Sequence, residues 1–278
     1  MSPDGGDARA SRRPARALLA ASIAACLGSG SGFGCKDFGD PVQPAGAGNG
    51  DSLGTVTFAP AKDNTLYEDP QGRLSNGAGS SMFAGTTSFR VGFRIRRALI
   101  AFDFADSIPA GATIRSVRLV LHMSRTVALA DTVSLHRVLA NWGEGTSVAS
   151  GGFGGGGGGG PAATGDATWL HRFFSTLTWS TPGGDFTPTP SAQIQVGGIG
   201  SYTWGSTAAM VADVESWLED PSGNYGWILV GEEHGTASAK RFDTRESAAA
   251  DRPRLVVEYA VPAQVVSTLA DRAARPAR

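Results

Sequence analysis

Regular alternation of apolar and polar side chains over residues 114–123 constrains the fold of this chain more than any other feature. One face of the extended segment carries the apolar side chains Val117, Leu119, Leu121 and Met123. Arg118 and His122 lie on the opposite face. A period of two places successive side chains on opposite sides of a strand, so this segment predicts a half-buried strand of an antiparallel sheet.

Other short segments rich in β-branched and apolar residues are separated by turns. They span residues 55–59, 96–104, 133–138, 225–230 and 255–259. Many short strands joined by turns are typical of a sandwich of two packed sheets. We therefore predict an all-β fold, an antiparallel β-sandwich.

One helix interrupts this pattern. Ser206 and Thr207 can cap it, and apolar residues then recur at helical spacing as far as Leu218. Asp220 and Pro221 end it. Because no β-α-β alternation surrounds the helix, we expect it to cross one end of the sandwich.

Length and charge exclude several classes of protein. The chain has 278 residues, which suits one large all-β domain, and 41% of them are hydrophobic, which is enough to bury a core. The formal net charge is −1. No basic surface is therefore expected to neutralise phosphates, and we predict no nucleic-acid partner. Two cysteines and four histidines argue against a disulfide scaffold and a histidine-based metal centre.

Residues 1–26 predict a secretory or lipoprotein signal. Four arginines precede the apolar segment 17–25, which is too short to span a membrane. Small residues then precede Cys26, the favoured site of lipidation, and Cys35 is the alternative. We expect a protein that is secreted or lipid-anchored at the bacterial cell envelope, with membrane contact only through the N-terminal lipid.

The rest of the chain divides into a tether, a module and a tail. Residues 27–52 predict a flexible tether, residues 53–260 the β-sandwich module, and residues 261–278 a disordered tail. Within the module, the long irregular loop 143–192 contains a run of glycines at 151–160. Glycine loses the most backbone freedom on ordering, so we expect this run to form a surface insertion without regular structure.

Several stretches of the module follow one another in a recognisable order. They are Asp63 to Tyr67, Asn76-Gly77, Arg96 to Phe104, Ile108 to Ile114, Leu135 to Val138, Trp142 to Thr146, Asp213 to Trp217, Asn224 to Trp227, Arg245 to Ser247, and Arg252 to Leu255. Together they resemble the extracellular DNRLRE family, which is similar to family-96 carbohydrate-binding modules and to disaggregatase-related repeats. The resemblance implies a sandwich of jelly-roll type and, for some members, contact with polysaccharide. The glycine insertion after Glu144 departs from the spacing of simpler members.

Two groups of side chains are candidates for polysaccharide contact. The first lies in or near the irregular loop: Trp169, His171, Arg172, Trp179 and Trp204. Flat aromatic rings suit the apolar face of a sugar, and the alternative for each tryptophan is packing in the core. For Trp217 and Trp227, in periodic apolar segments, the core is favoured. The second group is Arg90, Arg94 and Arg96, which share strand parity and suit the carboxylates of a uronate polymer, unless they are solvated or paired with acidic residues.

Four carboxylates are candidates for binding a structural calcium ion. The candidates are Asp63, Glu68, Asp243 and Glu258. Calcium prefers oxygen ligands, but no loop of the D-x-D-x-D-G type is present. No other cofactor is predicted.

The predicted function is non-catalytic binding of a polysaccharide, with uronates as one class of ligand, at the cell surface. One alternative is a structural or adhesion module that binds a protein or matrix partner. A second is a polysaccharide-active enzyme, for which the sequence contains no H-E-x-x-H motif. The sequence leaves the glycan and the oligomeric state open.

Overall fold

A computed structural model describes residues 50–87, 95–104, 107–150, 156–235 and 237–263. The predicted signal, both cysteines and most of the tether and of the tail lie outside these residues. So do Arg90, Arg94 and the first half of the glycine run.

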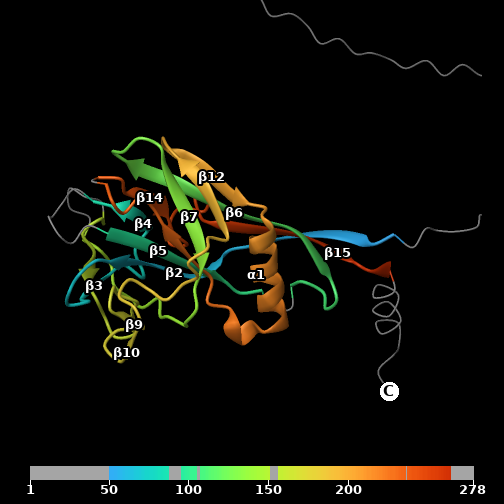
Figure 1. The fold of residues 1–278 in the computed structure, drawn as a ribbon, viewed down its shortest axis with the longest axis horizontal. Coiled ribbons are helices and arrows are strands. Elements are labelled where there is room, and N and C mark those ends of the chain that lie inside the picture. The colour runs from blue at the N-terminus through green and yellow to red at the C-terminus, as the bar shows by residue number, and fades with distance from the viewer. Residues whose placement is uncertain (1–49, 88–94, 105–106, 151–155, 236, 264–278) are drawn as a thin grey trace, which may run out of the picture. The chain divides into compact units, whose positions relative to one another are not determined.

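The described residues form an antiparallel β fold with one α-helix, as predicted (Figure 1). The strands are β1 (Ser52–Phe58), β2 (Pro60–Tyr67), β3 (Leu74–Ser75), β4 (Ser81–Thr86), β5 (Ile95–Phe102), β6 (Thr113–Thr126), β7 (Asp131–Arg137), β8 (Gly160–Pro161), β9 (His171–Phe173), β10 (Leu177–Thr178), β11 (Ala192–Val196), β12 (Gly200–Gly205), β13 (Trp227–Val230), β14 (Lys240–Asp243) and β15 (Arg254–Val261). The helices are α1 (Ala208–Glu219) and the 3₁₀ turn η1 (Pro221–Gly223).

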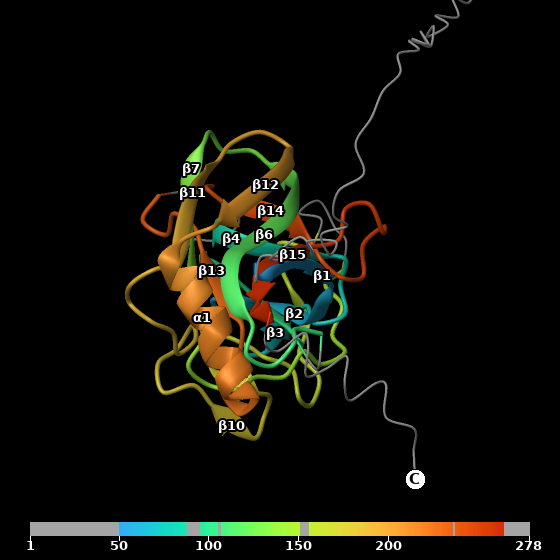
Figure 2. The ribbon, with the colours of Figure 1, turned by 90° about the vertical axis from the view of Figure 1, so that its right-hand side faces the viewer.

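One curled sheet supplies both layers of the fold. Its strand order is β1-β15-β6-β14-β4-β5-β13-β7-β11, with β12 also beside β6 and β2 also beside β5. Strand β4 joins the two halves, because its residues 81–84 pair with β14 and its residues 85–86 pair with β5. Figure 2 shows β7, β11 and β13 on the side of α1, and β1 and β15 on the other.

The alternation in residues 114–123 is confirmed as a half-buried strand. Val117, Leu119, Leu121 and Met123 are fully buried, whereas Arg118 and His122 are partly exposed. The buried face packs in the main core with apolar side chains of the other layer, among them Ile100 and Leu135. Removal of this apolar area from water is the main contribution to the stability of the fold.

Helix α1 also begins and ends where the sequence predicts. The Thr207 hydroxyl accepts a hydrogen bond of 3.1 Å from the Met210 N–H, which caps the first turn. Pro221 follows at the other end. Met210, Val214 and Trp217 are buried, so the apolar face of the helix closes the core. None of the helices described is long and apolar enough to span a membrane.

The described part of the glycine run is mostly buried, whereas the sequence predicted a surface insertion. Gly156, Gly157 and Gly160 are buried, and the Tyr67 hydroxyl donates a hydrogen bond of 2.9 Å to the Gly156 carbonyl. Gly159 has a φ of +73°, and a Cβ there would lie 3.1 Å from Tyr67. The absence of side chains therefore lets this segment pass close over β2.

Candidate functional site

Most of the tryptophans belong to the core. Trp142, Trp204, Trp217 and Trp227 are at most 1% exposed, and Trp179 is 5% exposed. The core positions predicted for Trp217 and Trp227 are thus confirmed, with their ring centres 4.6 Å apart. Trp179 and Trp204 were candidates for sugar stacking, but their buried rings have no free face, and this prediction is corrected.

The other three candidates from the irregular loop lie on or beside the β9–β10 hairpin. Trp169, His171 and Arg172 are all partly exposed there. The Arg97 guanidinium lies 5.0 Å from the centre of the Trp169 ring and covers part of it. Partly exposed Phe174 lies against His171, with ring centres 5.3 Å apart, and the sequence prediction missed it. Figures 1 and 2 place β10 at the end of the module opposite β12.

Arg96 is a structural residue and does not belong to an exposed clamp. It is 5% exposed, and its guanidinium lies 4.9 Å from the Tyr67 ring centre. Its Nε donates to the Gly157 carbonyl at 3.0 Å. Burial lowers the pKa of Arg96. The prediction that Arg96 faces a ligand is corrected, because the side chain fastens the glycine segment to the sheet.

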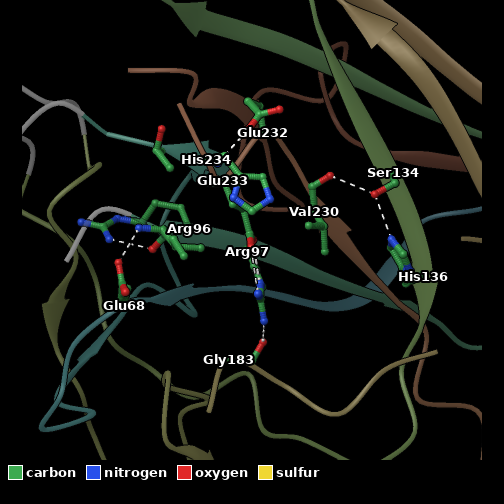
Figure 3. Close-up of polar contacts among 12 residues, drawn as sticks. Glu68, Arg96, Arg97, Ser134, His136, Gly183, Val230, Glu232, Glu233 and His234 are labelled. Carbon is green, nitrogen blue, oxygen red and sulfur yellow. Dashed lines mark hydrogen bonds and ion pairs between the residues drawn. The ribbon is translucent and has the colours of Figure 1, made fainter. Parts of the chain in front are cut away.

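Arg97 points in a different direction from Arg96, as expected for successive strand residues (Figure 3). It forms a two-bond ion pair with Glu233, with distances of 2.7 and 2.9 Å, and donates to the Gly183 carbonyl at 2.8 Å. Arg97 thus holds two loops against β5: the loop after β13 through Glu233, and the loop before β11 through Gly183.

The four calcium candidates occupy separate places. Asp63 accepts the backbone N–H of Arg245, Glu68 that of Ile95, and Glu258 pairs with Arg118. Asp243 pairs instead with His122, at 2.6 Å. Within the described ranges, the only group of three side chains placed to share a metal ion is His122, Asp243 and Asp251. The predicted set is therefore corrected, because the fold does not bring these carboxylates together.

Four of the stretches behind the DNRLRE resemblance meet in space around Asp63 and Asn64. The Asn64 amide donates to the Glu144 carbonyl at 2.7 Å, and its oxygen accepts from the Ser75 hydroxyl at 3.0 Å. The Glu144 carboxylate accepts the Asp63 N–H at 2.9 Å and two bonds from the Arg245 guanidinium, of 2.8 and 2.7 Å. Residues far apart in the sequence thus form one polar network.

Burial changes the acid–base behaviour of this network. The carboxyl of Asp63 is fully buried, and desolvation raises its pKa well above the ordinary value. Desolvation also raises the pKa of Glu144 and lowers that of Lys62 to about 8. Asp63 and Glu144 are a pair of neighbouring carboxylates, but Asp63 has no exposed surface with which to flank a glycosidic bond.

A half-open hollow of about 240 Å³ lies beside this network. It is lined by Asn76, Gly79, Ser80, Ser81, Val148, Ala149, Gly156, Arg241 and Asp243. The Asn76 amide donates to the Ser81 carbonyl at 2.6 Å, and its oxygen accepts the Ala149 N–H at 2.6 Å, so the rim is held in place. The polar groups and the 60% exposed Val148 offer both hydrogen bonds and an apolar contact.

Arg241 is the charged donor of this hollow. Its Nε donates to the Ser124 hydroxyl at 3.1 Å. To other residues that the structure describes, its two terminal nitrogens make no hydrogen bond. Arg241 and Asp243 share strand parity in β14, but nothing in the sequence indicated that Asn76, Val148 and Gly156 would gather opposite them.

No family model matches this chain, and no curated protein matches it either. The likeness to the DNRLRE family therefore stays a prediction, based on the stretches whose residues meet around Asp63.

Proposed function

We propose that this chain is a non-catalytic carbohydrate-binding module that holds an acidic polysaccharide in the hollow beside Arg241. The supporting observation is the position of Arg241, whose terminal nitrogens are available at the rim of a preformed polar hollow. A guanidinium can donate two parallel hydrogen bonds to a carboxylate, which suits a uronate unit. The predicted resemblance to carbohydrate-binding families points to the same class of ligand.

The other lining groups suit the remaining parts of a sugar. The carboxylate of Asp243 can accept hydrogen bonds from sugar hydroxyls, and Ser80 and Ser81 offer further polar groups. Val148 and Ala149 provide an apolar wall for the C–H face of the ring. Since the hollow is small, we propose that it binds one or two units of a longer chain.

The proposed location is outside the cytoplasm. The support is the predicted signal in residues 1–26, with Cys26, or alternatively Cys35, as the lipid attachment site. A lipid at either cysteine followed by the predicted tether would keep the module at the envelope surface, where polysaccharides are accessible.

Affinity electrophoresis of the purified protein tests the proposal. We expect alginate or pectin in the gel to retard the protein, and neutral xylan to retard it much less. Arg241→Ala should abolish retardation, and Arg241→Lys should weaken it, because an ammonium cannot form the paired bonds. Arg254→Ala is the matched control, since it removes the same charge from an exposed position at the start of β15.

Two outcomes would contradict this site. If Arg172→Ala abolishes retardation and Arg241→Ala does not, the glycan binds the β9–β10 hairpin. If no polysaccharide retards the wild type, the glycan-binding function is wrong.

Adhesion to a protein partner is the second candidate function. Val127, Leu129 and Ile199 are 81%, 88% and 70% exposed on two turns. These turns are neighbours, because a Cβ at Gly197 would lie 3.4 Å from Ala130. Clustered exposed aliphatic side chains favour contact with another macromolecule. If Leu129→Ser leaves glycan retardation unaltered, this aliphatic surface takes no part in the glycan binding proposed for the hollow.

A further inference from the structure

Strands β14 and β15 pair with successive parts of β6. Between the two pairings lie the side chains of His122, Asp243 and Asp251. Strand β14 pairs with residues 123–126 of β6, and β15 pairs with residues 113–120. His122 lies between the two pairings. The connection between β14 and β15 therefore leaves the sheet at Asp243 and returns just after Asp251, with both carboxylates beside the same imidazole.

The three side chains present their ligand atoms to one another. The His122 Nδ1 lies 2.6 Å from Oδ2 of Asp243 and 3.7 Å from Oδ1 of Asp251. One ligand atom of each residue lies within 4.8 Å of the other two. The side chains are 26%, 15% and 44% exposed, respectively, so an ion from solvent can reach them.

No arginine or lysine of the described residues forms an ion pair with this group, although the charge of Asp243 acts on the nearby Arg241 guanidinium. Across the described ranges, the only ion-pair partner of Asp243 and of Asp251 is His122. Arginines are near in the sequence, but they bond elsewhere: Arg241 Nε donates to the Ser124 hydroxyl, and Arg252 Nε to the Ser247 carbonyl. Two carboxylates thus share a single imidazole, which carries at most one positive charge.

We propose that His122, Asp243 and Asp251 form a binding site for a divalent first-row transition metal ion, with Zn²⁺ as the representative. Imidazole together with carboxylate oxygens is a ligand set for zinc and its neighbours, whereas calcium and magnesium take oxygen ligands. The site replaces the predicted calcium site, with which it shares only Asp243. Three protein ligands leave at least one position for water.

The spacing suits such an ion after small side-chain movements. Zinc bonds of about 2.0–2.2 Å at tetrahedral angles place ligand atoms roughly 3.4 Å apart. The two distances from Nδ1, 2.6 and 3.7 Å, lie on either side of that value. The open side of the site has a route to solvent, because Asp243 also lines the hollow.

Calorimetric titration of the metal-free protein with ZnCl₂ at pH 7 tests the site. We expect one Zn²⁺ ion per chain, and we expect His122→Gln and Asp251→Asn each to weaken binding by at least about tenfold, the scale found even for groups behind metal ligands. His234→Gln is the matched control, because His234 is exposed on another loop. Titration with Co²⁺ gives a second readout, as visible absorption bands of tetrahedral or five-coordinate cobalt.

Asp251→Asn keeps the test independent of folding, since this half-exposed side chain is replaced by one of the same shape. Thermal unfolding of each metal-free variant checks that it is native. The proposal is wrong if the wild type binds no Zn²⁺ under these conditions, or if both folded variants bind it as tightly as the wild type. No glycan enters these measurements, so the result is separate from that for the proposed function.

Discussion

The backbone N–H of Arg245 donates a hydrogen bond of 3.0 Å to Oδ2 of Asp63, a residue 182 positions earlier in the chain. The other carboxyl oxygen of Asp63 is buried, and within the described part of the chain it has no hydrogen-bond partner. A carboxylate with one unsatisfied oxygen is costly in a desolvated place. Burial therefore raises the pKa of the Asp63 carboxyl, because it disfavours the charged form in the folded protein.

Asp63→Asn should remove part of the pH dependence of stability. Because the pKa of Asp63 is raised in the folded state, that state retains a proton which the unfolded chain releases near pH 3.8. The free energy of unfolding should then fall as pH rises from 3.8 to the raised value, by up to about 1.4 kcal/mol per pH unit. Asparagine cannot ionise, and its oxygen can still accept the Arg245 N–H.

Urea unfolding at several pH values measures this effect. Above the window, Asp63→Asn should be at least as stable as the wild type. Asp51→Asn, at an exposed position near the start of β1, is the control variant. Equal pH slopes in the wild type and Asp63→Asn would show that Asp63 is already ionised in the fold.

Lys62→Met should change the pH dependence of stability at alkaline pH. The contribution of Lys62 has the opposite sign to that of Asp63. The pKa of Lys62 is lowered from 10.5 to about 8 by burial, so between these values the unfolded chain binds more protons than the folded one. The wild type therefore gains stability from this group as pH rises from about 8 to 10.5. The variant should lack that gain, while methionine retains packing against Trp142. Urea unfolding measures the pH profile of each protein, and the difference between the profiles gives the contribution of Lys62. Identical profiles would refute the lowered pKa of Lys62.

Gly145→Ala should be strongly destabilising, unlike Gly158→Ala. Gly145 has a φ of +76°, and a Cβ there would lie 1.4 Å from Oδ1 of Asp166. Backbone strain and the displaced carboxylate should together cost at least about 2 kcal/mol. A Cβ at Gly158 meets nothing within 4 Å, so its effect should stay within about 0.5 kcal/mol. Unfolding midpoints in urea compare the pair, and similar losses would contradict the close approach.

Trp204→Phe should reduce stability without changing glycan retardation. Trp204 is fully buried, and its Nε1 donates to the Val133 carbonyl at 3.0 Å. The smaller ring leaves a cavity and an unpaired carbonyl, at a cost of about 1–3 kcal/mol. Thermal unfolding measures this loss. Loss of retardation by the folded variant would return Trp204 to the list of ligand contacts.

Asp243→Asn should weaken both zinc binding and glycan retardation. Asp243 lines the hollow and also contacts His122. The neighbouring variants should separate the two properties: Asp251→Asn should affect only zinc, and Arg241→Ala only the glycan. Calorimetry and affinity gels on the same three preparations test this pattern. If Arg241→Ala weakens zinc binding as much as Asp243→Asn, the two sites are not distinct in the way proposed.

The fold class and the boundaries of several elements were readable from local patterns. Alternation in residues 114–123 and the Thr207 cap of α1 both held, because period, capping and turn chemistry act between residues that are near in the chain. The core positions of Trp217 and Trp227 followed from the same periodicity. The hollow and the polar network could not be read from local patterns, since their residues come from distant segments.

Antiparallel strands and one capped helix follow from the order of residues along this chain, because side-chain period and local hydrogen bonding set those elements. Which polar residues share a site depends on the folded arrangement of distant segments. Arg96 shares strand parity with the other predicted clamp arginines, yet its burial against Tyr67 removes it from any ligand. The sequence pattern around His122 did not indicate a site, because Asp243 and Asp251 come beside it only where the chain returns after β14. Burial and proximity depend on how the sheet curls, and no local sequence pattern indicates which distant residues come close together.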